Sequence, residues 1–86
     1  MHERGLINDL LKQIAQLALA QEARQVEAVS VWLGAFCHIS GAHFREHFVS
    51  GCRGTIAEGA DLVLEESNDV THPHAQYILL LGIDVS

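Results

Sequence analysis

The segment VEAVSVWLG, residues 26–34, is the starting point for predicting the fold of this chain. Its β-branched and aromatic residues are typical of a strand, and Gly34 ends the run. Before this segment, residues 4–21 carry apolar side chains at helical spacing, with polar residues on the opposite face. The polar residues 21–25 connect the two. The first part of the chain is therefore predicted to form a helix followed by a strand.

The rest of the chain adds one helix and two strands to this unit. Ser40 is a suitable N-cap for a helix over residues 41–52, in which two phenylalanines share one face. Residues 60–66 alternate between apolar and polar and predict a strand. Residues 77–85 predict a last strand, and its apolar run on both faces favours a covered, central position. The order α-β-α-β-β predicts an α+β fold with two helices packed on one face of a three-stranded mixed sheet.

Length and composition limit the class of protein. The 86 residues, 49% of them hydrophobic, suit a single folded domain over residues 1–86, and a core this small favours a homodimer as supplement. The net charge is −6 with only five Lys and Arg residues, which argues against nucleic acid as a partner. No signal peptide and no membrane-spanning apolar run are predicted. Cys37 and Cys52 form no CxxC pair, so we expect a reducing, cytoplasmic location.

The start of the chain, Met1-His2-Glu3, is the first candidate metal site. It offers a free α-amine, the backbone amide nitrogen of His2 and its imidazole within one chelating stretch. Nitrogen donors packed this tightly favour a tetragonal arrangement, which suits Ni(II) or Cu(II) over Zn(II). Glu3 adds a carboxylate nearby, and Met1 supplies the amine because a bulky second residue should block its removal. The alternative is a frayed terminus that carries a solvent-exposed histidine.

A second candidate is the pair His43 and His47 in the predicted second helix. Their i, i+4 spacing places both imidazoles on one face, as a metal clamp requires, and Glu46 could add an oxygen ligand. The alternative is a polar helix face in solvent. Adjacent Cys37 and His38 could bind a borderline metal or support nucleophilic chemistry, whereas the alternative makes Cys37 a small buried apolar residue.

The third candidate is His72-Pro73-His74, where alternate residues of an extended chain would face the same way and share a metal. The alternative is an ordinary surface loop. The sequence contains no P-loop, dinucleotide fingerprint, GxSxG elbow or HExxH pair. Motifs therefore provide no support for an enzyme.

Several landmarks in the right order resemble the HypA/HybF family of nickel metallochaperones in hydrogenase maturation. They are Met1-His2-Glu3 directly before an amphipathic helix, the segment VSVWLG at 29–34, TIAEGADL at 55–62 and LLLGIDV at 79–85. The resemblance implies a nickel site built from the terminal amine of Met1, from His2 as ligand and from Glu3 as support. It also implies delivery of nickel to a [NiFe] hydrogenase precursor, the large subunit, with a maturation GTPase as partner, or delivery to urease.

Two departures from the family pattern bear on this function. The family inserts a zinc domain with two CxxC pairs between its last strands, whereas residues 67–76 stand here without a cysteine, so no structural zinc is expected. In some members an acidic residue before the second helix contributes to nickel binding, and Ser40 aligns with it. His38 or His43 could compensate.

Three functional hypotheses follow from the sequence. The first is a metallochaperone that binds Ni(II) at its N-terminus. The second is a metal-free adaptor that retains the chaperone fold and contacts a hydrogenase subunit or an assembly factor, which Ser40 and the missing zinc domain favour. The third is an enzyme or redox protein that uses Cys37 with a histidine.

Overall fold

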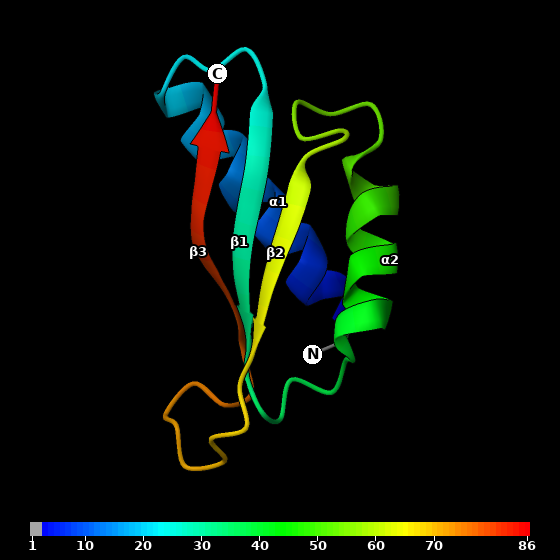
Figure 1. Ribbon diagram of the computed structural model, residues 1–86, viewed down its shortest axis with the longest axis vertical. Helices are drawn as coiled ribbons and strands as arrows, with labels where there is room; N and C mark the ends of the chain where they lie inside the picture. The colour runs from blue at the N-terminus through cyan, green and yellow to red at the C-terminus, as the bar shows by residue number, and fades with distance from the viewer. Residues whose placement is uncertain (1–2) are drawn as a thin grey trace.

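The structure is a computed structural model, and it describes residues 3–86. Two helices and three strands follow one another in the predicted α-β-α-β-β order (Figure 1). Their bounds are α1 Glu3–Ala20, β1 Val26–Leu33, α2 Gly41–Cys52, β2 Asp61–Glu66 and β3 Ile78–Val85. The predicted α+β fold, with two helices packed on a three-stranded mixed sheet, is confirmed. The observed bounds differ from the predicted ones by no more than one residue.

Strand β1 is the centre of the sheet, which has the order β2-β1-β3. It pairs in parallel with β2, so that Val29 faces Leu62 and Leu33 faces Glu66. A parallel pair needs a crossover between its strands, and α2 provides it. On the other side β1 pairs antiparallel with β3, and Val26 there faces Val85. Both neighbours protect β1, in which Val26, Val29 and Val31 are fully buried.

The prediction that the last strand is central was wrong, because β3 lies at an edge of the sheet. Its side chains are half-buried at best, and Leu81 is 56% exposed. One face of β3 packs on the core through Leu80 and Ile83, while Leu81 lies on the face away from the helices. An apolar run therefore shows that a strand has one covered face, but it does not determine how many strands flank it.

Helix α1 crosses behind the sheet and buries one stripe of side chains against it (Figure 1). Ile7, Leu10, Ile14 and Ala18 recur at helical spacing and are at most 4% exposed. Leu19 is 79% exposed, so the apolar stripe is narrower than the sequence composition of the helix suggests. No helix of the described residues 3–86 is long and apolar enough to cross a membrane.

Helix α2 begins at a double cap. Ser40, the predicted N-cap, accepts a hydrogen bond from the backbone N–H of His43 at 3.1 Å. The carboxylate of Glu66 accepts a second bond from the N–H of Gly41, also at 3.1 Å. Both acceptors satisfy N–H groups that have no partner inside the helix. One turn further, Phe44 and Phe48 stack with ring centroids 5.9 Å apart and are fully buried, which fixes the opposite face of α2 towards solvent.

Candidate metal site

The predicted terminal site lies largely outside the described residues. Met1 and His2 are not among them, and Glu3 is described only as the first residue of α1. The rest of α1, which the structure describes, shows which part of α2 lies next to the beginning of α1.

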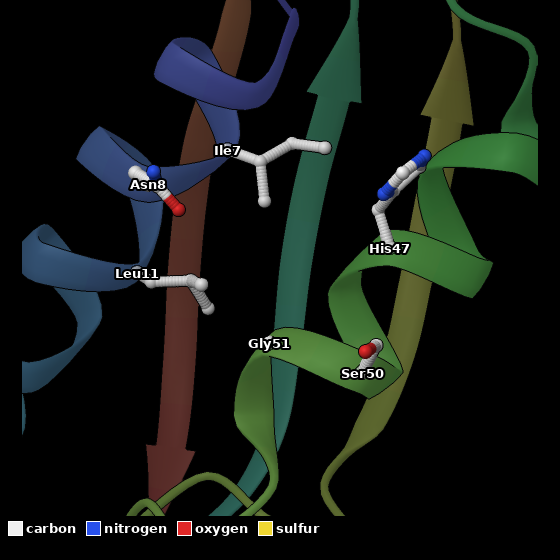
Figure 2. A pocket seen from close by; sticks show the side chains of 6 residues that line it. All are labelled: Ile7, Asn8, Leu11, His47, Ser50 and Gly51. Carbon is white, nitrogen blue, oxygen red and sulfur yellow. The ribbon is translucent and has the colours of Figure 1, made fainter.

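Helices α1 and α2 run side by side in the same direction (Figure 2). Ile7 and Leu11 of α1 point towards His47 and Gly51 of α2, and together they line a shallow hollow between the helices. Gly51 allows this approach, since a Cβ there would lie 2.8 Å from Cδ1 of Leu11. The lining residues are spaced by one turn on both helices, Ile7 and Leu11 on α1 and His47 and Gly51 on α2.

The next step backwards along the two helices leads from Ile7 to Glu3 and from His47 to His43. The first turn of α1 therefore lies alongside the first half of α2, which carries the predicted histidine pair. Figure 1 agrees, because α1 starts beside the beginning of α2.

The structure brings His43 and His47 together, as their spacing predicted. Their Nε2 atoms lie 2.7 Å apart, and the ring centroids lie 4.5 Å apart with a tilt of 40°. His43 is exposed and His47 is half-buried against α1. Glu46 lines a second, open hollow together with both histidines, but it does not join the pair as a third ligand. No group of three or more His, Cys, Asp or Glu side chains in residues 3–86 is placed to hold a metal ion.

Glu66 is a candidate residue that the sequence analysis missed. Ser40 carries no charge, yet the carboxylate of Glu66 lies at the same end of α2, bonded to Gly41. Glu66 ends β2 and faces Leu33 at the end of β1, and the chain continues from Leu33 towards Ser40. The position of Glu66 could have been inferred from the topology, because parallel strands joined by a helix end at the same edge of a sheet. The carboxylate that Ser40 lacks is thus supplied at this end of α2 by Glu66, at the end of β2.

Cys37 and His38 do not form a reactive pair. Cys37 is 6% exposed and its Sγ donates to the carbonyl oxygen of Ile39 at 3.5 Å, whereas His38 points into solvent with a left-handed φ of 63°. Cys52 is also buried, and burial raises the pKa of its thiol to about 11. Since the thiolate is the nucleophile and the metal ligand, these positions support the prediction that both cysteines are small buried apolar residues.

The loop between β2 and β3 uses its histidines in local packing. The ring of His72 lies against Trp32 with centroids 4.8 Å apart, and its Nδ1 accepts a hydrogen bond from the backbone N–H of His74. The segment forms turns instead of the extended chain that was predicted, and the rings of His72 and His74 lie with their centroids 5.7 Å apart. Asp69 accepts hydrogen bonds from the hydroxyl and the backbone N–H of Thr71, which lower the pKa of its carboxyl group.

The sequence comparisons with known proteins agree on one family. Residues 1–72 match the family model described as "Hydrogenase/urease nickel incorporation, metallochaperone, hypA". The chain is 41% identical over 83 residues to hydrogenase maturation factor HypA of Salmonella typhimurium, covering 94% of this chain and 70% of that protein. It is 38% identical over 66 residues to the HypA of Escherichia coli K12, covering 77% of this chain and 57% of that protein.

Two solved structures share the fold. The Ni metallochaperone HypA from Helicobacter pylori superposes with a TM-score of 0.82 at 16% identity, covering 99% of this chain and 97% of that chain. A second HypA solution structure gives a TM-score of 0.76 at 16% identity, covering 100% of this chain and 97% of that chain. At this identity the two likenesses concern the arrangement of helices and strands only.

Proposed function

The chain belongs to the HypA family of nickel-incorporation metallochaperones, and from this premise we propose that it binds Ni(II) through Met1, His2 and Glu3. The observation that carries the proposal is the family match over residues 1–72, which includes these three residues at its start. Nickel is the cargo of such a protein, and the family consists of maturation factors and not of catalysts.

The chemistry of the terminus suits this cargo. The amine of Met1, the amide nitrogen of His2 and its imidazole can occupy neighbouring positions of a tetragonal site, and the carboxylate of Glu3 supports them. Binding requires a deprotonated amine, so acid should weaken it.

The client of this chain, on the same proposal, is the precursor of a [NiFe] hydrogenase or a similar nickel enzyme, with a maturation GTPase as partner. The curated relatives in Salmonella and Escherichia are named hydrogenase maturation factors, and the family description adds urease. An open terminal site on a small domain fits a protein that releases its metal to another protein.

A metal-free adaptor is the second candidate function, and Ser40 is the observation that favours it. A serine hydroxyl replaces the carboxylate that stands at this position in some members of the family. The position of Glu66 weakens that argument, because its carboxylate reaches the same end of α2.

The test is a calorimetric titration of Ni(II) into the untagged chain at neutral pH, beside His2→Ala and a His74→Ala control. We expect a tight binding event that His2→Ala weakens at least about 100-fold, since loss of one chelating group also removes the gain from linking it to the others. His74→Ala should bind like the parent chain. Absence of the tight event in the parent chain would favour the adaptor.

A further inference from the structure

The side chains of His43 and His47 meet on the surface of α2. Their Nε2 atoms lie 2.7 Å apart, next to the face that buries Phe44 and Phe48. Neither imidazole has another protein hydrogen-bond partner in the described residues 3–86. The backbone N–H of His43 serves the cap of α2, so the ring itself is not needed to start the helix.

We propose that His43 and His47 form a second, open site for a divalent transition metal, separate from the N-terminus. Imidazole nitrogens bind such ions at about 2.0–2.1 Å, and two of them in neighbouring tetragonal positions lie about 2.9 Å apart. The observed separation of the two Nε2 atoms is 2.7 Å, which is close to this distance. The helix thus already holds both ligand atoms near the spacing that a chelate needs.

A metal ion requires a free lone pair on each Nε2 atom. Two neutral imidazoles that share a hydrogen bond through Nε2 contain one donor and one acceptor. When the metal binds, the donating ring carries its proton on Nδ1 instead, and the lone pairs of both Nε2 atoms become available. This step is a change of tautomer that releases no proton.

The surroundings leave the metal position open. His47 lines the hollow between the helices together with Ile7 and Leu11 of α1 (Figure 2). Both histidines line a second open hollow on α2, together with Glu46, Ser50 and Arg53. No third protein ligand converges on the pair within residues 3–86, so water fills the remaining coordination positions. A site with two protein ligands binds a metal ion weakly and exchanges it quickly, which suits temporary binding.

The place of the pair suggests its role. The one-turn spacing of the lining residues along α1 and α2, extended by one more turn, puts the first turn of α1 alongside His43. The pair therefore lies near the start of α1. The site itself depends only on the geometry of α2. Its role, to bind nickel temporarily before or after the terminal site does, rests on the proposed function.

The experiment uses the full chain with Gly-Ser placed before Met1, which moves the free amine away from Met1 and His2, and titrates it with Ni(II). We expect a weak, saturable event of one ion per chain. His43→Ala and His47→Ala should each weaken it at least about tenfold, because a single imidazole loses the gain from chelation. A composition-matched control is His47→Val combined with Val49→His, which moves the imidazole to another face at an exposed position and should also lose the event.

Two further controls separate this site from other histidines and from the terminal site. His38→Ala and His74→Ala should leave the weak event unchanged. If the extended chain binds no nickel, or binds it equally well without His43 and His47, the second site is refuted whatever the native terminus does. A native chain that shows only the weak event would refute the terminal site and leave the histidine pair standing.

A measurement on the unaltered chain guards against variants that fail to fold. Diethylpyrocarbonate modifies accessible imidazoles, and peptide mass mapping reports each histidine separately. We expect Ni(II) in excess to protect His43 and His47 together while His38 stays reactive. Equal modification of the pair with and without nickel would overturn the proposal.

Discussion

Replacing Ser40 with alanine should destabilise the protein by about 1 kcal/mol, because it removes the side-chain acceptor for the backbone N–H of His43. The loss stays near this value for two structural reasons. Glu66 continues to accept from Gly41, so one of the free N–H groups remains satisfied, and the backbone bond from Phe44 to the carbonyl of residue 40 needs no side chain. In a domain of this size about 1 kcal/mol lowers the melting temperature by about 4–8 °C.

The assay is thermal unfolding followed by far-UV circular dichroism, with Ser40→Asn as the matched control. Asparagine caps helices about as well as serine and adds no charge beside Glu66, so its melting temperature should stay close to that of the parent chain. If Ser40→Ala melts with the parent, or if Ser40→Asn falls as far as Ser40→Ala, the hydroxyl does not cap α2 and the reasoning is refuted.

Three further changes test the packing and the titration of the core. Phe44→Ala should cost about 3–5 kcal/mol, because it empties a fully buried ring position, and urea unfolding should show the loss as a lower midpoint. Gly34→Ala should cost about 1–3 kcal/mol, because its Cβ would lie 2.3 Å from the carbonyl oxygen of Ala75, whereas Gly82→Ala, with nothing within 4 Å, should unfold near the parent midpoint. Raising the pH from about 9 to about 11 should lower the free energy of unfolding by on the order of 2 kcal/mol through Cys52. The reason is that the thiol loses its proton at lower pH in the unfolded chain than in the folded protein. The same decline in a Cys52→Ala variant would contradict this.

Local signals explain why most of the fold could be predicted from the sequence. Strand β1 and helix α2 have the predicted bounds because Gly34 ends one and Ser40 starts the other. The pair His43 and His47 was also predictable, since i, i+4 side chains meet on any helix.

The errors and omissions concern contacts between distant segments. The edge position of β3 depends on the parallel pairing of β1 with β2, and an apolar run cannot report which strands become neighbours. Glu66 lies 25 residues from Gly41 in sequence, and only the register of two parallel strands brings its carboxylate to the start of α2. The extended backbone predicted for His72 and His74 was wrong, because the loop forms turns there.

The most direct test of nickel binding at the terminus is a titration of the chain after acetylation of its terminal amine. Acetylation keeps every side chain, including His2 and Glu3, and removes only the amine as a nitrogen donor. We expect the tight Ni(II) event of the native chain to disappear and the weak event of the histidine pair to remain. Tight binding of equal affinity in the acetylated chain would contradict a site built on the amine of Met1.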